Sequence, residues 1–242
     1  MARDKRGTRS GAVSARPWQA VVVGATGAVG SALVRELIAS PTCGGVVAVI
    51  RRATDLFDAS VGRNRVHLEV ADFAELEVVT ERVADGCSAA FCTVGIGQPR
   101  KISRAEFRLV DVEYARAFAR GAKAAGVRHI LLLSAVGANA ASRNWYLSVK
   151  GEAEQAVIGT GISRTSLFRP SLLVTRTIRY GLQDRLAQAL FPFVAPLLPR
   201  KWHQIRVEDL AAAMIANAER DQAIGVETLH YGDFVRLIGE RA

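Results

Sequence analysis

The sequence predicts an α/β fold with a doubly wound parallel sheet, and three observations lead to this prediction. Short apolar runs alternate with segments of helical spacing, as in 18–25 followed by 28–40. The runs are continuously apolar rather than alternating, which indicates strands buried on both faces. A glycine-rich turn joins the first run to the first helix. Strands and helices in this alternation form βαβ units around a parallel sheet.

The elements can be assigned in order from these signals. Apolar runs bounded by polar residues predict strands, and apolar positions three and four residues apart predict helices. The expected strands lie at 18–25, 45–52, 64–70, 88–95, 127–135, 163–170 and 225–232. The expected helices lie at 28–40, 74–84, 103–125, around Tyr146, 176–191 and 206–220.

The rhythm of the chain changes after Pro170. The segment 191–199, "FPFVAPLLP", is apolar and broken by proline. We expect residues 17–242 to form a single domain, with about 171–242 contributing a small C-terminal cap that packs over the carboxyl edge of the sheet. Within that cap, 191–199 could instead be a substrate lid or a patch that touches a membrane.

The net charge of +9 is concentrated at the amino end, where residues 1–16 hold five Lys and Arg against one Asp. This segment has no apolar periodicity and contains Gly and Ser throughout, so we predict a disordered basic arm. It also lacks the apolar core of a secretory signal. We expect a solvated tail with no dedicated nucleic-acid partner, although such a tail can contact nucleic acid or anionic lipid.

Cysteine and histidine usage argues against disulfide and metal chemistry. Cys43, Cys87 and Cys92 have no C-x-x-C spacing, which predicts a reducing, cytoplasmic compartment. The four histidines are scattered, so no metal site is expected. No apolar run reaches the length of about 18 residues needed for a membrane span.

The turn after the first strand has the spacing expected of a dinucleotide-binding loop. Gly24 permits a tight turn, Gly27 allows backbone to approach a pyrophosphate, and Gly30 lets the helix pack closely on the strand. The helix amino end then offers N–H groups and a positive dipole to phosphates. The alternative is a glycine-rich turn with no ligand. The remaining residues that we assign to this cofactor loop are Thr26, Ala28 and Val29.

The end of the second strand favours NADP(H) over NAD(H). NAD sites usually place a carboxylate there, whereas an arginine accommodates a 2′-phosphate. Here the strand runs into Arg51 and Arg52, and no carboxylate follows until Asp55. The alternative is that the arginines are solvated strand ends and that NAD(H) binds equally well.

The motifs together resemble the short-chain dehydrogenase/reductase superfamily in its extended and atypical branches. Within it, the chain is most similar to the Tat-interacting-protein-type members, which share Ser…Tyr-x-x-x-Lys-Gly-Glu followed by Phe-Arg-Pro. The resemblance extends from about Trp18 to Gly232. It depends on "GATGAVG" (24–30), "VADF" (70–73), "FCTVG" (91–95), "LLLSAVGA" (131–138), "YLSVK" (146–150) and "FRPSLL" (168–173).

The resemblance implies a catalytic group of Tyr146, Lys150 and Ser134. Tyr146 would exchange a proton with the substrate oxygen, and Ser134 would hold that oxygen. Lys150 stands one helical turn from Tyr146, where an ammonium favours the phenolate. It would also donate to the ribose of the nicotinamide. The alternative is that the pair is an accident of a helix surface.

Further cofactor contacts follow from the same resemblance. Asp72 would lie against the adenine amino group, although it also suits a helix N-cap. Backbone at 93–95 would pass the ribose, and backbone at 170–171 would pass the nicotinamide. Relatives often carry Asn where this chain has Asp111, which puts a water-mediated proton relay in doubt. The cofactor residues in these stretches are Asp72, Phe73, Thr93, Val94, Gly95, Pro170 and Ser171.

These expectations describe an NADP(H)-dependent oxidoreductase that reduces a carbonyl or oxidises an alcohol of a small-molecule substrate. Two alternatives stay open: an epimerase- or dehydratase-like enzyme using the same cofactor, and an NADP(H)-binding regulator without turnover. A homodimer or a protein partner also stays open.

Overall fold

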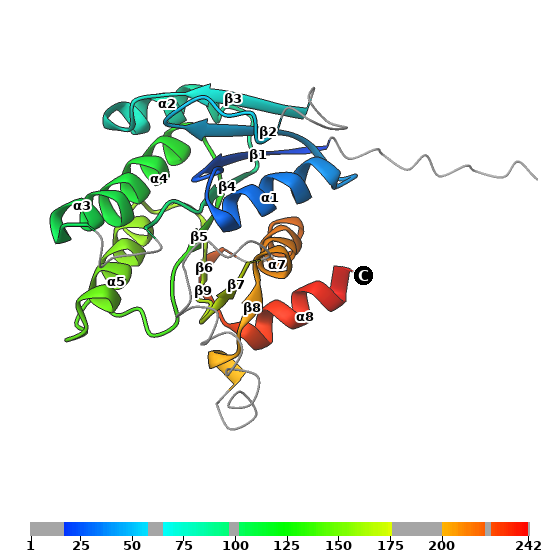
Figure 1. Cartoon of the computed structure of the whole chain (residues 1–242). Coiled ribbons are helices and arrows are strands. Elements are labelled where there is room, and N and C mark those ends of the chain that lie inside the picture. The colour runs from blue at the N-terminus through cyan, green and yellow to red at the C-terminus, as the bar shows by residue number, and fades with distance from the viewer. Residues whose placement is uncertain (1–16, 58–64, 97–101, 176–199, 221–223, 242) are drawn as a thin grey trace, which may run out of the picture.

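The computed structural model describes residues 17–57, 65–96, 102–175, 200–220 and 224–241. Its centre is a seven-stranded parallel sheet in the order β3-β2-β1-β4-β5-β6-β9, with helices on both faces (Figure 1). This confirms the predicted doubly wound α/β fold of the Rossmann type. The expected basic arm (1–16) and the expected helix at 176–191 lie outside the described residues.

The strands occupy the predicted positions with shorter bounds, except β2, which has the predicted length but begins and ends two residues earlier. The main sheet consists of β1 (Trp18–Val23), β2 (Cys43–Ile50), β3 (Val66–Val70), β4 (Ala89–Cys92), β5 (His129–Leu133), β6 (Arg164–Phe168) and β9 (Gly225–Leu229). A separate two-stranded sheet pairs β7 (Leu173–Val174) with β8 (Ile205–Arg206). The order reverses between β1 and β4, and the carboxyl edge at this switch point is where open α/β sheets bind ligands.

Helices cover each face of the sheet in a separate layer. One layer holds α1 (Ala28–Ala39), α7 (Val207–Glu219) and α8 (Tyr231–Arg241), and the other holds α2 (Leu76–Val83), α4 (Tyr114–Ala124) and α5 (Trp145–Ile158) (Figure 1). The short elements are η2 (Phe73–Glu75), α3 (Arg104–Arg108), η4 (Leu109–Glu113) and η6 (Arg200–Trp202).

Strand β1 shows why the strand sequences are continuously apolar. Ala20 and Val22 pack into the core on the side of α1 and α7. Val21 and Val23 pack into the core on the side of α2 and α4. All four are completely buried. Because successive side chains of a strand point to opposite faces, a strand covered on both faces must be apolar at every position.

The C-terminal cap contains fewer residues than the sequence predicts. Strand β9 is the seventh strand of the main sheet, and α7 packs on α1. Helices α7 and α8 therefore cover one face of the sheet and β9 is one of its strands, so these three elements do not form a cap. The remaining cap segment includes β7 and β8, and most of it, 176–199, lies outside the described residues. Helix α8 was not predicted.

The segment predicted as one helix over 103–125 is interrupted. Helix α3 leads into η4, a π-helical turn in which the Tyr114 N–H donates to the Leu109 carbonyl, five residues back, and α4 follows. Such a turn inserts one extra residue into the helical repeat and rotates the side chains that it carries. Here it carries Asp111 into the interior, where the side chain is 2% exposed.

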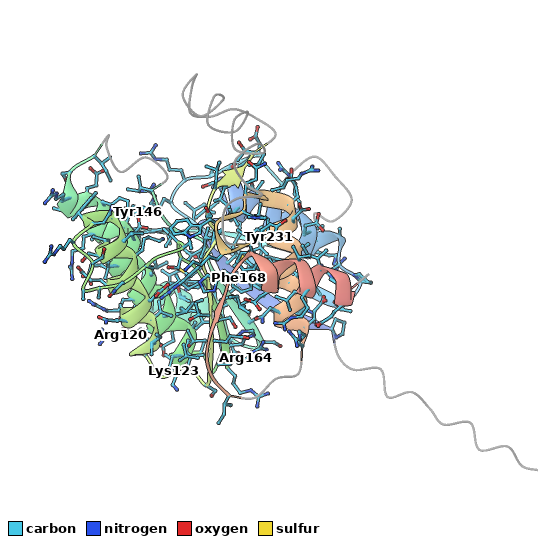
Figure 2. The ribbon with its side chains drawn as sticks, turned by 90° about the horizontal axis from the view of Figure 1, so that it is seen from below. Arg120, Lys123, Tyr146, Arg164, Phe168 and Tyr231 are labelled. Carbon is cyan, nitrogen blue, oxygen red and sulfur yellow. The ribbon has the colours of Figure 1, made fainter. Side chains whose placement is uncertain are left out.

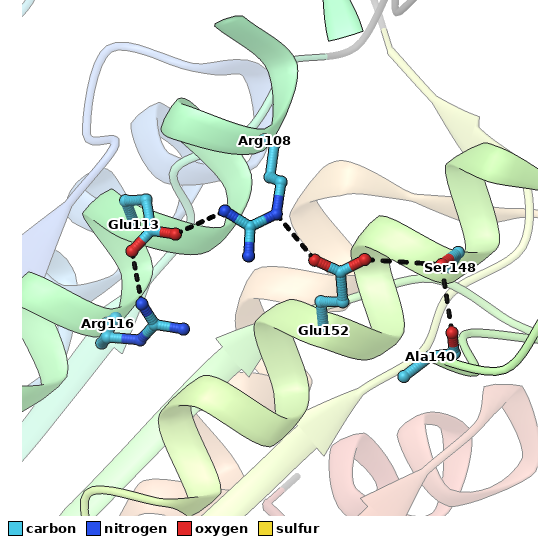
Figure 3. Close-up of polar contacts among 6 residues, drawn as sticks. All are labelled: Arg108, Glu113, Arg116, Ala140, Ser148 and Glu152. Carbon is cyan, nitrogen blue, oxygen red and sulfur yellow. Dashed lines mark hydrogen bonds and ion pairs between the residues drawn. The ribbon is translucent and has the colours of Figure 1, made fainter. Parts of the chain in front are cut away.

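A chain of surface ion pairs fixes this turn against α5 (Figure 3). Arg108 donates to Glu113 at 2.7 Å and to Glu152 on α5 at 2.8 Å. Glu113 also accepts from Arg116, and Ser148 donates to the Ala140 carbonyl at 3.1 Å. Each exposed pair contributes little alone, but a connected network holds geometry better than an isolated pair.

Candidate active site

A cavity of about 500 Å³ opens at the carboxyl edge of the sheet. It is lined by the glycine loop (24–27), the end of β2 and the residues after it (49–54), and the residues after β4 (93–96). Phe73, Glu106 and Val110 complete the lining. Strands β1, β2 and β4 therefore all end at this cavity, as expected at the switch point of the fold.

Glycine is needed at positions 24, 27 and 30 for different structural reasons. Gly24 has φ +82°, and a Cβ there would lie 2.5 Å from the backbone of Thr93 and Val94. A Cβ at Gly30 would overlap the Gly24 carbonyl oxygen. At Gly27, however, a Cβ would meet only that carbonyl oxygen, at 3.2 Å. The chain's own packing thus demands glycine at 24 and 30, whereas glycine at 27 keeps the cavity open.

The amino end of α1 faces this cavity without a capping group. Gly27 is the N-cap residue, no side chain accepts from the first turn, and the first turn contains no acidic residue. The orphan N–H groups and the positive end of the helix dipole therefore remain available to an anion. Ala28, Val29 and Gly30 form this first turn and do not line the cavity themselves.

Two arginines stand at the end of β2, as the sequence predicts. Arg51 and Arg52 are exposed and line the cavity together with Ala53 and Thr54. The Arg51 guanidinium lies over the Phe73 ring, 5.7 Å from its centroid. Phe73 is buried, and the edge of Tyr114 packs against its ring, so it gives Arg51 a fixed platform.

Asp72 acts as a helix cap. Its Oδ1 accepts from the Ala74 N–H at 3.0 Å. The Asp72 side chain is exposed, and the neighbouring residue, Phe73, lines the cavity. The cap role is thus present, and an additional contact with adenine remains a prediction.

The residues after β4 connect the cavity to η4. Thr93 Oγ1 donates to the Val23 carbonyl at 2.9 Å and fixes β4 beside β1. The Ile96 N–H donates to Asp111 Oδ2 at 3.1 Å. Val94 and Gly95 line the cavity between these two points. The cavity wall is therefore tied directly to the π-helical turn.

Tyr146 is the second residue of α5 and lies at the carboxyl edge, at the opposite end of the molecule from Lys123 and Arg164 (Figure 2). Its ring is half-buried and packs against Phe107, in a cluster that also includes Ile96. Ile96 lines the cavity and Tyr146 does not, so this cluster separates Tyr146 from the cavity lining. Its hydroxyl makes no hydrogen bond within the described part of the chain.

Lys150 lies one turn further along α5 and is held beneath Tyr146. Its Nζ donates to Asp111 Oδ1 at 3.1 Å and to the Leu133 carbonyl at 3.2 Å. Burial lowers the pKa of Lys150, but Asp111 and Tyr146 outweigh this effect, so the pKa is raised above its ordinary value. Of the three ammonium N–H groups, two have partners and one is left for a ligand.

Ser134 is not brought to Tyr146. Its hydroxyl donates to Glu154 Oε1 at 2.5 Å, two helical turns along α5 from Tyr146. Glu154 also accepts from Arg169 through Nε at 2.8 Å and Nη2 at 2.5 Å. Ser134 is 5% exposed and does not line the cavity. Pro170 and Ser171 do not line it either, although the Pro170 carbonyl accepts from the Val136 N–H.

The structure therefore brings nine of the predicted cofactor residues into the lining of the cavity, whereas Tyr146 and Lys150 stand on α5 and do not line it. Sequence reasoning missed several lining residues, of which Glu106 and Val110 come from α3 and η4. No motif marks them. The cavity reaches these residues because the chain after β4 folds back along α5.

Comparison with known proteins agrees with this geometry. A family model described as NAD(P)H-binding matches residues 24–221. The chain belongs to this NAD(P)H-binding family. Among curated relatives, Protein HTATIP2 of Rattus norvegicus is 31% identical over 199 residues, covering 81% of this chain and 79% of that protein. Protein FMP52-1, mitochondrial, of Scheffersomyces stipitis is 31% identical over 176 residues, covering 72% of this chain and 76% of that protein. These matches confirm an atypical short-chain dehydrogenase/reductase.

Solved structures of low identity show the same fold. MoeE5 in complex with UDP-glucose and NAD superposes with a TM-score of 0.63 at 18% identity, covering 93% of this chain and 82% of that one. The UDP-N-acetylglucosamine 4-epimerase from Methanobrevibacter ruminantium M1 superposes with a TM-score of 0.67 at 14% identity, covering 93% and 81%. Because the sequence identity is 18% or lower in both, this similarity shows only that the fold is shared.

The residues present fit the cofactor that the family implies. The uncapped helix end suits a pyrophosphate, and the open space at Gly27 admits its close approach. Both Arg51 and Ile96 line the cavity, so the cavity connects the end of β2 with the residues after β4. Within the described residues no group of three His, Cys, Asp or Glu is arranged for a metal ion, and no helix is long and apolar enough to cross a membrane.

Proposed function

We propose that this protein binds NADP(H) in the cavity and reduces a carbonyl, or oxidises an alcohol, of a small-molecule substrate. The observation that supports this most is the layout of the cavity. The Gly27 and α1 end suits phosphates, two arginines line the cavity, and Tyr146 belongs to a cluster that includes the lining residue Ile96. A cytoplasmic location remains a prediction from the cysteine pattern. The names of the FMP52 relatives include the word mitochondrial.

The preference for NADP(H) depends on Arg51 and Arg52. Guanidinium groups pair with phosphate oxygens through parallel N–H donors, and none of the described residues that line the cavity at the end of β2 (49–54) carries a carboxylate to accept from a ribose hydroxyl. Replacing both with alanine should weaken NADPH binding about tenfold or more, because charge-assisted hydrogen bonds are lost. NADH binding should change little. Arg236→Ala, an exposed arginine on α8, is the control.

In the proposed reaction Tyr146 exchanges the proton. The cofactor supplies hydride chemistry when bound. Tyr146 then donates its hydroxyl proton to the carbonyl oxygen, or accepts a proton from an alcohol, and its free hydroxyl fits that role. Lys150 stays charged beneath the phenol and has one N–H left for a ribose hydroxyl.

The position of Ser134 changes its proposed role. Its proton is directed to Glu154, and the next two residues, Ala135 and Val136, have no hydroxyl. We therefore propose that Ser134 positions α5 through Glu154 and does not hold the substrate oxygen. This arrangement also favours the second candidate function, an NADP(H)-binding regulator without turnover. An epimerase- or dehydratase-like activity is compatible with the fold.

Tyr146→Phe separates the two functions. NADPH affinity and turnover of a carbonyl panel are measured for the wild type and the variant. An enzyme keeps its affinity and loses about 10²-fold or more in rate, because a positioned acid is removed. Tyr114→Phe, which keeps its ring contact with Phe73, should retain both properties. A wild type that binds NADPH, turns over nothing and captures a protein partner only with NADPH would support the regulator.

A further inference from the structure

Lys150 and Asp111 form a buried ion pair one helical turn from Tyr146. The Lys150 side chain is 9% exposed and that of Asp111 is 2% exposed, with Nζ and Oδ1 3.1 Å apart. An ammonium in the interior is costly unless a counter-charge lies beside it, and removing one partner leaves an uncompensated buried charge.

Both oxygens of Asp111 are held. Oδ1 accepts from Lys150, while Oδ2 accepts from the Ile96 N–H at 3.1 Å. The π-helical turn directs the side chain inward, and the Arg108 ion pairs hold that turn against α5 (Figure 3). Asp111 therefore joins the cavity wall at Ile96 to the ammonium beneath Tyr146.

The other titratable groups near Lys150 cannot replace Asp111. Tyr146 faces it from its own helix and Cys92 from β4. Burial raises the pKa of the Cys92 thiol to about 12, so this thiol carries no charge. Glu154 stands one turn further along α5, but Arg169 and Ser134 occupy its oxygens. Within the described residues, Asp111 is the carboxylate that pairs with Lys150.

We propose that Asp111 is a positioning residue that keeps Lys150 protonated and fixed beneath Tyr146. The inference builds on the proposed function, because the fixed, charged Lys150 is the form that assists the phenol and leaves one N–H for a ribose. Without the carboxylate, burial is the largest influence on Lys150, so its pKa falls and the ammonium loses its proton at a lower pH.

The first test needs no cofactor and no turnover. Unfolding by urea is measured between pH 7 and 9.5 for the wild type, Asp111→Asn, the double variant Asp111→Asn/Lys150→Met, and Glu113→Gln. In Asp111→Asn, above the pH at which the folded chain releases the lysine proton, the unfolded chain still binds it. Over that range its folding constant should rise by up to about tenfold per pH unit relative to the wild type.

The two companion variants identify the source of this slope. The double variant contains no buried ammonium, so its slope should match that of the wild type, and it should be more stable than Asp111→Asn at pH 7. Glu113→Gln removes an acid two residues away that pairs only with exposed arginines, and its slope should also match that of the wild type. A flat Asp111→Asn profile, or a double variant as unstable as the single one at pH 7, would overturn the proposal.

The second test uses NADPH. In Asp111→Asn, NADPH affinity and any turnover should fall over the same pH range in which its stability slope begins, while the wild type shows no such fall. A pH-independent loss would mean that Asp111 only supports the backbone at Ile96, and it would overturn the proposal. If the wild type binds NADPH but has no turnover, the proposed reaction fails, whereas the stability slope still decides the role of Asp111.

Discussion

Protonation of His129 should destabilise the fold in a narrow acid range. His129 begins β5 and is 7% exposed, and its Nε2 lies 2.8 Å from Ser166 Oγ. Burial, together with the nearby Arg164 guanidinium, lowers its pKa to about 3. The unfolded chain has the ordinary histidine pKa of about 6.5. The folded state therefore prefers the neutral ring, and stability is lost as pH falls below about 6.5.

The size of the loss follows from the difference in proton binding. At pH 5 the unfolded chain gains about 1.5 units times 1.36 kcal/mol, or about 2 kcal/mol, relative to pH 7.5. Any folded pKa below about 4 gives the same loss at pH 5. Other groups also titrate, so the measurement is a difference: urea unfolding of the wild type and His129→Gln at pH 7.5 and 5. The wild type should lose about 2 kcal/mol more than the variant, whereas His67→Gln, whose side chain is 67% exposed, should behave like the wild type. Equal losses for the wild type and His129→Gln would refute the reasoning.

Three further predictions concern the glycine loop and the Glu154 network. Gly30→Ala should cost about 1–3 kcal/mol or more of unfolding free energy, because the new Cβ overlaps the Gly24 carbonyl oxygen; a thermal or urea unfolding curve like that of the wild type would contradict this. Ser134→Ala should cost about 1–2 kcal/mol of stability and reduce turnover far less than Tyr146→Phe; equal rate losses would show instead that Ser134 contacts the substrate. Arg169→Gln should cost about 3 kcal/mol, because Glu154 is 4% exposed and would lose its counter-ion; urea unfolding at pH 7.5 checks this, and an unchanged midpoint would contradict it.

The sequence predicted the parts of the site that local backbone geometry determines. The positive φ of Gly24 and the contact of Gly30 with the Gly24 carbonyl oxygen lie within one strand–turn–helix unit, so the glycine spacing was enough to place the loop. The position of Arg51 followed likewise from the end of an apolar strand. The spacing of Tyr146 and Lys150 on α5 was also predicted, but Glu154, which follows at the same interval, was not.

Other features depend on contacts between distant segments. The Asp111–Lys150 pair requires a π-helical turn, and the regular periodicity of 103–125 gave no sign of the extra residue. The hydroxyl of Ser134 points to α5 because Glu154 and Arg169 converge there from separate elements. Helix α7 was assigned to a cap because its sequence shows an apolar face without showing that α1 is its partner.

Calorimetric titration of NADPH into the wild type and Gly27→Val tests the central claim most directly. Among the described residues, a Cβ at position 27 would meet one backbone atom, the Gly24 carbonyl oxygen at 3.2 Å, so a matching thermal unfolding curve must first show that the variant folds. The valine would fill the space kept for the pyrophosphate. The account predicts that the wild type binds NADPH, more tightly than NADH, and that the variant binds at least tenfold more weakly. A wild type that binds neither nucleotide, or a folded variant that binds NADPH equally well, would contradict it.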